Sequence, residues 1–543
     1  MSAGPSTTVH AALAAGLKAQ GVGTLFGLLG DANLFLADAF VRAQGGRFVP
    51  ATHEAAAVQM GLGHADATRE AAAVTITHGP AVTNALTSLV AGVKSTLPLV
   101  LLAGDTPARD PNHPQAMPQR MLAETLGVGF VQLRGPATAC EDLHTAFRRA
   151  RAERRPVMLN MPVEFMWEQT ALVPPPRALP PTPVLPADEG PLEEAVGIIA
   201  AARRPLVLAG RGALHAREAL VRLADRIGAP LATSLKGSAL FAGHPYDLGV
   251  CGTLSTPAAA EAIGAADCIV SFGAGLNRFT TGRGAYVQGK RLVQVDADPL
   301  QLGRRRAPDA ALLGDPALVA ERLLHWLEAA EIPSSRSTDT LDPAALRAPH
   351  PVPSPAVAPG TVDLTEALIR IDRAVPQSRV FVTDGGRFMG AAWTRIGVER
   401  PEDIVLTVSA GSIGMGMGHA IGAAVARPGQ PTLLVTGDGG FMLQGLTDLP
   451  TAVREALDLI VVICNDQAYG AEYVQMTDRQ MDPAISTFNW PPLAEVARAL
   501  GCEAVHVTGP EGLEAAEAAI AARSRPLVIE LMLDAAQVPR LQL

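Results

Sequence analysis

Several residue types are scarce in this chain of 543 residues, and each scarcity excludes a class of protein. The five cysteines are scattered, odd in number and never spaced as CxxC, which argues against a disulfide framework or a zinc site and favours a reducing compartment. We therefore expect them to be small buried hydrophobic residues. Aromatic residues make up only 4% and charged residues only 18% of the chain, while hydrophobic residues reach 48%, a composition typical of well-buried α/β proteins rather than disordered ones.

Long runs of basic residues and long runs of apolar residues are missing as well. The net charge is −9 and no long basic run occurs, so nucleic acid and acidic membranes are not expected as partners. No apolar run reaches the length of a membrane-spanning helix, and the N-terminus lacks a charged start followed by an apolar core. These absences predict a soluble, cytoplasmic enzyme that has no membrane segment.

The chain is long enough to form several hydrophobic cores, because 543 residues exceed the usual size of one domain. Two proline-rich stretches, Val173 to Pro186 and about Asp342 to Gly360, interrupt the sequence. Proline breaks helices and central strands, so both stretches are expected to be extended linkers. They predict three domains, at residues 1–172, 190–335 and 361–543.

Each predicted domain alternates short apolar runs with alanine-rich helical runs. Examples of the apolar runs are LVLLAG, PLVLAG, CIVSFG and LIVVICND. This alternation predicts an α/β protein made of three doubly wound parallel-sheet domains. Ligands of such sheets bind at the carboxyl ends of the strands, and the glycine motifs of this chain fall at those ends.

The most informative of these motifs is Gly437-Asp438-Gly439-Gly440, which follows the apolar run from Pro431 to Thr436. Glycines after a strand let backbone N–H groups approach an anion closely. The aspartate cannot bind phosphate itself, but it can hold Mg²⁺, which then binds the phosphate oxygens. A second apolar run, Leu459 to Cys464, ends in Asn465-Asp466 and offers further oxygen ligands. Together the two strand ends predict a metal–diphosphate site.

This pair of motifs resembles that of thiamine diphosphate (ThDP) enzymes, in which GDG is followed, after a spacer of about this length, by NN or a close variant. The resemblance covers nearly the whole chain, from Gly16 to about Asp534. Three α/β domains with GDG in the third is the plan of acetolactate synthases, benzoylformate decarboxylases and pyruvate decarboxylases. The resemblance implies a pyrimidine-binding first domain, a central domain, a diphosphate-binding third domain, and ThDP and Mg²⁺ as cofactors.

The resemblance leaves two assignments of the second metal ligand open. Counting from Asp438 makes Asn465 the ligand. Alignment on Tyr469-Gly470 instead makes Asp466 the ligand and Ala468 a donor through its backbone carbonyl. We favour Asp466, because aspartate is a good ligand for Mg²⁺.

Further contacts with the cofactor are implied by the resemblance. Asp384-Gly385-Gly386 follows another apolar run and is expected to line the diphosphate pocket. Gly411 and Ile413 match the segment that clamps the pyrimidine, with Ile413 as an apolar wedge under the bent cofactor. Glu54 matches the glutamate that shares a proton with a pyrimidine nitrogen, and the small alanines after it would allow a dry site. The alternative for Glu54 is an exposed residue in the first turn of a helix.

Two acidic residues are candidates for proton transfer to the substrate. The segment Phe26 to Asn33, which includes Gly27, resembles the GxPGDxN loop of pyruvate decarboxylases. Asp31 matches the aspartate of that loop, which acts in protonation steps. Glu472 matches the second acidic residue of those enzymes.

A histidine and a glutamine complete the candidates. The adjacent histidine pair of pyruvate decarboxylases is absent, because the corresponding region reads Pro111-Asn112-His113-Pro114. His78 lies in a loop that faces the cofactor in the family, where its imidazole could donate a proton near neutral pH or cap a turn. Gln119 is a candidate match for an active-site glutamine of acetolactate synthases.

The central domain raises the question of a flavin. Leu208 to Gly212 and Val295 to Pro299 resemble the edges of a nucleotide-binding fold, and acetolactate synthases hold FAD in this domain. Where those enzymes carry Arg-Phe-Asp-Asp-Arg, this chain reads Gly275 to Phe279, GLNRF, a departure that argues against FAD. The alternative is a purely structural domain.

The resemblance implies a lyase or transferase that removes CO₂ from a 2-oxo acid on ThDP. The resulting enamine is then either protonated, as in a decarboxylase, or added to an aldehyde or ketone, as in an acetolactate synthase-like carboligase. A flavin- or nicotinamide-linked oxidoreductase and a non-catalytic relative are the alternatives. The central domain has no GxGxxG after a strand, which counts against the first, and the presence of Glu54 and Asp438 counts against the second. Because the family shares each site between subunits, the resemblance also implies a homodimer or homotetramer.

Overall fold

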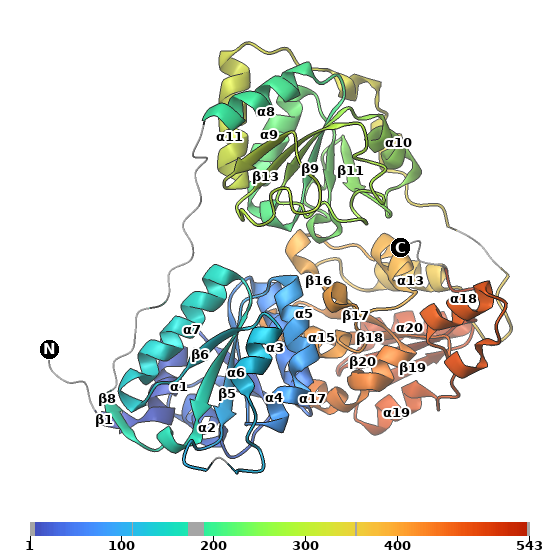
Figure 1. The fold of residues 1–543 in the computed structure, drawn as a ribbon. Coiled ribbons are helices and arrows are strands. Elements are labelled where there is room, and N and C mark those ends of the chain that lie inside the picture. The colour runs from blue at the N-terminus through green and yellow to red at the C-terminus, as the bar shows by residue number, and fades with distance from the viewer. Residues whose placement is uncertain (1–5, 111, 172–176, 178–188, 353–355, 540–543) are drawn as a thin grey trace. The chain divides into compact units, whose positions relative to one another are not determined.

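The computed structural model describes residues 6–110, 112–171, 177, 189–352 and 356–539 (Figure 1). The first predicted linker lies outside the described residues except for Arg177, and so do residues 353–355 of the second. The chain forms three six-stranded parallel sheets, one from each predicted domain, which confirms the predicted fold class. The N-terminal and C-terminal sheets with their helices form one compact unit, and the central sheet with its helices forms another.

The N-terminal sheet has the strand order β3-β2-β4-β5-β7-β6, and a separate antiparallel pair joins β1 to β8. β5 contains the predicted apolar run LVLLAG, and β4 and β7 are buried along their whole length. The strands are β1 (Ser6–Thr8), β2 (Thr24–Gly27), β3 (Arg47–Pro50), β4 (Ala72–Ile76), β5 (Leu99–Asp105), β6 (Gly129–Gln132), β7 (Pro156–Pro162) and β8 (Gln169–Ala171). The helices are α1 (Val9–Ala19), α2 (Leu34–Arg42), α3 (Glu54–Thr68), α4 (Pro80–Asn84), α5 (Leu86–Ser95), α6 (Gln119–Thr125) and α7 (Ala139–Glu153).

The C-terminal sheet repeats this topology, with the order β16-β15-β17-β18-β20-β19. Its strands are β15 (Val380–Thr383), β16 (Ile404–Leu406), β17 (Thr432–Gly437), β18 (Leu459–Asn465), β19 (Glu503–Val507) and β20 (Leu527–Met532). Its helices are α13 (Leu364–Ala374), α14 (Met389–Arg395), α15 (Gly416–Ala426), α16 (Asp438–Gly440), α17 (Leu449–Arg454), α18 (Gly470–Asp478), α19 (Leu493–Ala499) and α20 (Pro510–Ala522).

The central sheet has a different order, β11-β10-β9-β12-β13-β14, so the direction in which strands are added reverses between β9 and β12. Its strands are β9 (Pro205–Ala209), β10 (Leu231–Thr233), β11 (Asp247–Val250), β12 (Cys268–Phe272), β13 (Arg291–Asp296) and β14 (Ala310–Leu313). Its helices are α8 (Glu189–Ala201), α9 (Arg217–Ile227), α10 (Pro257–Ala265), α11 (Pro316–Ala329) and α12 (Pro343–Leu346).

Glycines allow the N-terminal and C-terminal sheets to share one core through α3 and α15, which lie side by side (Figure 1). A Cβ atom added to Gly422 would lie 1.9 Å from the carbonyl oxygen of Met60, and one added to Gly63 would lie 2.1 Å from that of His419. Only glycine permits such a close approach of two helix backbones. The small residues of both helices are therefore needed for the contact between the two sheets.

The second linker differs from its prediction at its start. An extended segment was expected from Asp342, but residues 343–346 form the short helix α12. The Asp342 carboxylate accepts a hydrogen bond from the Ala344 N–H (2.9 Å), and Pro343 suits the first helical position. Leu346 is buried, so packing of one apolar side chain holds the turn in place.

Two further observations bear on the predictions from composition. Four of the cysteines are buried and Cys140 is half-buried, as expected for small apolar residues. Within the described parts of the chain, no helix combines the length and apolar character that crossing a bilayer requires.

Candidate active site

Three loops at the carboxyl ends of β15, β16 and β17 converge in the C-terminal domain. The carboxylate of Asp384, after β15, accepts hydrogen bonds from the N–H groups of Gly414 (2.9 Å) and Met415 (3.3 Å) and from the hydroxyl of Thr436 (3.2 Å). Asp384 is 1% exposed, and burial raises the pKa of its carboxyl group. Its side chain therefore ties the three loops together, in addition to any contact with a bound diphosphate.

Small residues let these loops approach each other. A Cβ atom at Gly440 would lie 2.6 Å from the Asp384 carboxylate, and one at Gly385 would lie 3.3 Å from the side chain of Ile413. Gly411, just before Ile413, has a φ of 73°, in the left-handed region that favours glycine. The predicted cofactor-binding residues of the three loops thus form one group. Two further members of that group, Gly386 and Gly437, both lie against the ring of Phe388.

Two carboxyl groups follow the parallel neighbours β17 and β18, close enough for the charge of Asp466 to act on Asp438. Burial and the charge of Asp466 raise the pKa of Asp438 to about 7. Burial likewise raises the pKa of Asp466 to about 6, against the opposing effect of Arg387, whose Nη1 lies 3.9 Å from Oδ2. Adjacent buried carboxyl groups resist losing both protons unless a cation lies between them. This pair is therefore suited to bind a divalent cation.

Asn465 lies at the same strand end, but its side chain is engaged within the chain. Its Nδ2 donates to Glu530 (2.7 Å), and its Oδ1 accepts from the N–H of Gln467 (3.1 Å). In the described part of the chain, no group of three or more His, Cys, Asp or Glu side chains could hold a metal ion. A metal here would therefore combine the two carboxylates with neutral oxygens such as the Ala468 carbonyl. Such an all-oxygen set fits Mg²⁺.

The turn from Ala468 to Gly470 packs directly on the glycine-rich loop. The Ala468 N–H donates to the carboxylate of Asp466 (3.3 Å). A Cβ atom at Gly439 would lie 2.6 Å from the ring of Tyr469, and one at Gly470 would lie 3.0 Å from the Asp466 carboxylate. The turn therefore packs closely on the loop after β17. Backbone groups of both segments lie near Asp438 and Asp466.

Glu54 begins α3 in the N-terminal domain and is 9% exposed. Its Oε2 accepts a hydrogen bond from Nδ2 of Asn84 (3.0 Å). The preceding residue, His53, caps the helix by accepting from the Ala55 N–H (3.1 Å). The alternative of an exposed glutamate is therefore wrong, because the carboxyl group is buried and held by an amide.

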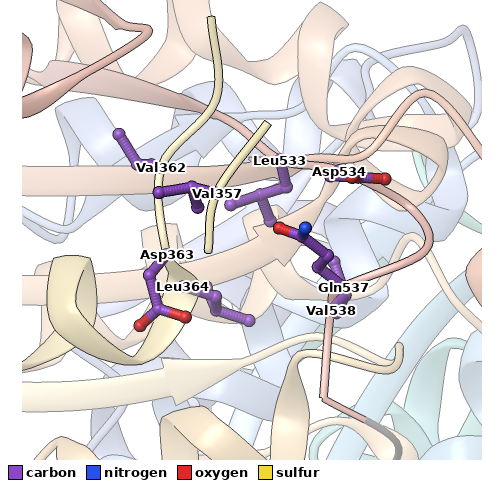
Figure 2. Close-up of a pocket in the computed structure, with 8 residues that line it drawn as sticks. All are labelled: Val357, Val362, Asp363, Leu364, Leu533, Asp534, Gln537 and Val538. Atoms are coloured by element: carbon purple, nitrogen blue, oxygen red, sulfur yellow. The ribbon is translucent and has the colours of Figure 1, made fainter. Parts of the chain in front are cut away.

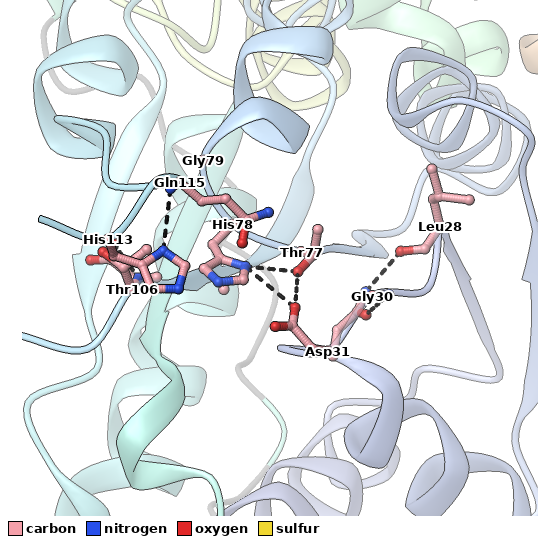
Figure 3. Close-up of polar contacts among 12 residues, drawn as sticks. Leu28, Gly30, Asp31, Thr77, His78, Gly79, Thr106, His113 and Gln115 are labelled. Atoms are coloured by element: carbon pink, nitrogen blue, oxygen red, sulfur yellow. Dashed lines mark hydrogen bonds and ion pairs between the residues drawn. The ribbon is translucent and has the colours of Figure 1, made fainter. Parts of the chain in front are cut away.

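Asp31 and His78 come together from two separate loops of the N-terminal domain (Figure 3). The hydroxyl of Thr77 donates to Oδ1 of Asp31 (3.0 Å) and lies 2.8 Å from Nδ1 of His78. Because the Thr77 proton is directed at Asp31, we assign the proton of neutral His78 to Nδ1, which donates to Thr77 and leaves Nε2 as an acceptor. His78 is 1% exposed, and burial lowers its pKa, so the neutral ring prevails at pH 7.

His113 is a site residue that the sequence analysis did not select. Its ring centroid lies 5.5 Å from that of His78 (Figure 3). The loop that carries it packs on Gly79, where a Cβ atom would lie 2.1 Å from the Gln115 carbonyl oxygen. Pro111, in the segment compared with a histidine pair, lies outside the described residues. A histidine between Asn112 and Pro114, shortly after a predicted strand, was the available signal.

Gln119 is buried and fixes the loop of His78. Its Oε1 accepts from the N–H of Gly79 (2.9 Å). Its Nε2 donates to the carbonyl of Gly104 (2.9 Å) and to Oδ1 of Asn160 (2.6 Å). These contacts use both ends of the amide, so Gln119 positions the loop after β4.

Two predicted residues lie apart from these groups. Glu472 is exposed in the first turn of α18, in the C-terminal domain. Gly27 is the last residue of β2, where a Cβ atom would lie 2.4 Å from the carbonyl oxygen of Thr75. Gly27 therefore permits the close pairing of β2 with β4 that places the Asp31 loop beside His78.

In the central domain, the loops after β9 and β12 pack on each other. Gly273 has a φ of 56°, and a Cβ atom there would lie 2.6 Å from the backbone of Gly212. In the segment that departs from the flavin-binding pattern, the Asn277 side chain accepts hydrogen bonds from the N–H groups of Phe279 (2.9 Å) and Thr280 (3.0 Å). The segment thus forms a tight turn, and the exclusion of FAD stays a prediction from the sequence.

A small cavity lies between the start of α13 and the segment that follows β20 (Figure 2). Its polar side chains are engaged within the chain. Asp363 accepts from the Glu366 N–H (2.7 Å), Asp534 from the Ala536 N–H (2.9 Å), and Gln537 donates to the Ala356 carbonyl (2.6 Å). The cavity is therefore a structural joint next to the end of β18, where the Leu533 N–H donates to the carbonyl of Asn465 (2.9 Å).

Comparison with known proteins assigns all three domains. Residues 7–126 match the model of the thiamine pyrophosphate enzyme N-terminal TPP binding domain. Residues 192–323 match that of the central domain, and residues 384–531 match that of the C-terminal TPP binding domain. Thiamine pyrophosphate (TPP) is another name for ThDP.

The relatives found span almost the whole chain. A sulfoacetaldehyde acetyltransferase of Castellaniella defragrans is 26% identical over 95% of this chain and 91% of its own length. Acetolactate synthase isozyme 2 large subunit of Escherichia coli is 27% identical over 98% of this chain and 95% of its own length. A probable acetolactate synthase large subunit of Methanocaldococcus jannaschii is 25% identical over 96% of this chain and 91% of its own length.

Proposed function

Because this chain belongs to the thiamine diphosphate-dependent enzymes, we propose that it uses ThDP and Mg²⁺ to decarboxylate a 2-oxo acid. The observation that carries the proposal is a pair of carboxyl groups at adjacent strand ends beside a glycine-rich loop, the buried Asp438 and Asp466, whose side chain is 9% exposed. ThDP, once bound, supplies an electron sink for the bond that breaks beside the keto carbon. The protein must bind and orient ThDP and the substrate, and it must supply or remove the protons that the reaction needs.

In the C-terminal domain, Asp438, Asp466 and the carbonyl of Ala468 would hold Mg²⁺, which neutralises the diphosphate. Backbone N–H groups of the loop from Gly437 to Gly440 would donate to the diphosphate oxygens. Ile413 and Gly411 would orient the pyrimidine. Gly411, Ile413 and the loop from Gly437 to Gly440 lie on the loops that Asp384 fixes, whereas Asp466 and Ala468 follow β18.

In the N-terminal domain, Glu54 would hold a proton against a pyrimidine nitrogen. Its burial supports this role, because a proton shared with a buried carboxyl group is not lost to water. The chain of hydrogen bonds His78–Thr77–Asp31 would accept or deliver a proton at Nε2 of His78. The ring of His113 lies 5.5 Å from that of His78, and Nδ1 of His113 accepts from the Gln115 N–H, so its Nε2–H could donate to a substrate carboxylate.

The second half of the reaction is proposed to be either protonation or carboligation. The acetolactate synthase relatives support ligation to a second carbonyl compound, an aldehyde or ketone. The relay from Asp31 to His78 supports protonation, and Glu472 could take part in it if another subunit brings it near. Two relatives named sulfoacetaldehyde acetyltransferase make sulfoacetaldehyde a second candidate substrate.

The experiment that tests this proposal is a substrate panel. Purified protein with ThDP and Mg²⁺ is incubated with a series of 2-oxo acids and with sulfoacetaldehyde, each with and without an acceptor aldehyde. We expect CO₂ release from at least one 2-oxo acid, and product analysis separates an aldehyde from a ligated product. Turnover of sulfoacetaldehyde alone would replace the proposal by the second candidate. Consumption of no compound, despite ThDP binding, would favour a non-catalytic relative.

We further propose that the site is completed across a homodimer, in which Glu54 of one subunit faces Asp438 of the other. The family resemblance and the open strand ends of both domains support this arrangement. A dimer of dimers would preserve the same sites. The boundaries at residues 1–172, 190–335 and 361–543 are part of the same proposal.

A further inference from the structure

One aromatic side chain contacts the candidate metal site directly. The indole N–H of Trp490 donates a hydrogen bond to Oδ2 of Asp438, with a distance of 2.9 Å between Nε1 and the oxygen. Trp490 precedes α19 and is partly buried against the shared core. The carboxylate also accepts from backbone N–H groups of its own loop, Gly439 among them. Each carboxylate oxygen has two lone pairs, so acceptor sites remain for a cation.

The segment that carries Trp490 is also fastened to the other metal loop. The Phe488 N–H donates to the carbonyl of Gln467 (2.7 Å), and the Tyr469 N–H donates to the carbonyl of Ser486 (2.9 Å). The ring of Phe488 stacks on Trp490, with centroids 4.7 Å apart, and meets Tyr469 edge-on at 4.6 Å. The segment 486–490 therefore connects the turn after Asp466 to the loop of Asp438.

The far end of this segment is anchored as well. The carboxylate of Glu530, which is fully buried, accepts hydrogen bonds from the N–H groups of Leu493 and Ala494 (3.0 Å each) at the start of α19. The same carboxylate accepts from Nδ2 of Asn465 (2.7 Å). Trp490 thus lies between two fixed points, both of which also hold the strand end at Asn465 and Asp466.

We propose that Trp490 is a positioning residue of the metal site, which fixes the Asp438 carboxylate in the orientation that receives the cation. The inference deepens the proposed function and rests on it. A carboxylate that is held before the cation arrives loses less conformational freedom on binding, and it points one oxygen at the cation from the start.

The test is the affinity for Mg²⁺, measured by calorimetry on full-length protein saturated with ThDP. Trp490→Phe keeps the stacking ring but removes the N–H donor. We expect Mg²⁺ to bind about 10-fold more weakly than it does to the wild type. The matched control is Trp393→Phe, because Trp393 donates to the hydroxyl of Thr383 (2.9 Å) rather than to a carboxylate. That variant should bind Mg²⁺ as the wild type does.

The possible results separate this inference from the proposed function. Equal Mg²⁺ affinity of wild type and Trp490→Phe would overturn the role of Trp490 alone. Failure of the wild type to bind Mg²⁺ with ThDP would overturn the metal site itself. If Trp490→Phe does not fold, a protein whose Trp167, Trp326 and Trp393 are changed to Phe reports on Trp490 by fluorescence. Adding Mg²⁺ with inorganic diphosphate should change its emission, and constant emission would contradict the proposal.

Discussion

Among single residues, Asp438 and Asp466 give the strongest support for the proposed metal site. Both are aspartates at strand ends, but the sequence alone could not decide between Asp466 and Asn465 as the second ligand. We keep Asp466 as the proposed ligand, because its charge acts on Asp438, whereas the amide of Asn465 is engaged by Glu530. Asn465 therefore supports the strand end, and Asp466 faces the other carboxyl group.

This difference predicts the effects of two alanine substitutions. Asp466→Ala should weaken Mg²⁺ binding by on the order of 100-fold, because it removes a charged ligand. Asn465→Ala should weaken Mg²⁺ binding less and lower thermal stability more, since it leaves one oxygen of the buried Glu530 with fewer donors. Calorimetric titration and thermal melts of both variants measure this. If Asn465→Ala is the variant that loses Mg²⁺, the assignment by counting from Asp438 is correct.

The hydroxyl of Thr77 is predicted to set the tautomer of His78. Thr77→Val keeps the shape of the side chain but removes the link to Asp31, so both protonation patterns of the ring become available. We expect kcat to fall on the order of 10-fold while ThDP and Mg²⁺ bind normally. Thr83→Val is the control, because Thr83 donates only to the nearby Pro80 carbonyl (2.8 Å). Equal losses in both variants would contradict a specific role for Thr77.

The sequence indicated which residues carry the chemistry, but it did not indicate which other residues contact them. Glu54, Asp438 and Asp466 were selected because the motifs that contain them resemble those of ThDP enzymes. Trp490 and Glu530 were not selected, although both contact the metal loops. Neither follows a glycine motif, and their contacts join segments that are far apart in the sequence. Only tertiary packing brings such residues together.

Among the helices, α3 shows how one sequence stretch serves both packing and chemistry. It begins with Glu54, and its middle lies against α15, with the Gln59 amide donating to Gln444 (2.6 Å) in the C-terminal domain. The alanines after Glu54 were expected only to allow a dry site. Which helix packs on which was not predictable, because many alanine-rich helices in this chain have similar faces. The glycine contacts at Gly63 and Gly422 decide it.

The same helix predicts a dependence of stability on pH. Burial lowers the pKa of His64, on α3, from 6.5 to about 4, and its ring packs on Phe26 at 5.5 Å. Because the folded state holds this ring neutral, the unfolded chain takes up the proton first as pH falls. The contribution of neutral His64 is complete above about pH 6.5 and is lost as the pH falls towards 4.

The loss amounts to about 3 kcal/mol at most. Urea denaturation midpoints between pH 7 and pH 4 should fall more steeply for the wild type than for His64→Gln, which cannot take up a proton there. The difference between the two curves isolates His64 from the other titrating groups. Parallel curves would show that His64 is not held neutral in the folded protein.

For the molecule as a whole, the sequence predicted the class of fold and the family, and both are confirmed. Strand runs of β-branched residues and the motif spacing were sufficient for that. The sequence did not predict that the first and third domains form one compact unit, nor that their sheets share one strand order. Both properties depend on contacts between residues several hundred positions apart, such as Arg47 with Glu455.

The proposed sharing of sites between subunits predicts complementation. Glu54→Gln and Asp438→Ala are each expected to be inactive, the first in cofactor activation and the second in metal binding. After subunit exchange, a heterodimer would contain one site with both wild-type residues, so an equal mixture should recover about a quarter of wild-type activity. Exchange is verified with differently tagged subunits. Confirmed exchange without any recovered activity would contradict the shared site.

The central claim, that Glu54 activates ThDP for decarboxylation, is tested most directly by one rate comparison. CO₂ release from the best 2-oxo acid is measured for wild type and Glu54→Gln, each saturated with ThDP and Mg²⁺ as verified by calorimetry. The account predicts that the variant binds both cofactors but is slower by on the order of 10²–10⁴-fold, because only the positioned acid–base group is lost. A variant that turns over at nearly the wild-type rate would contradict it.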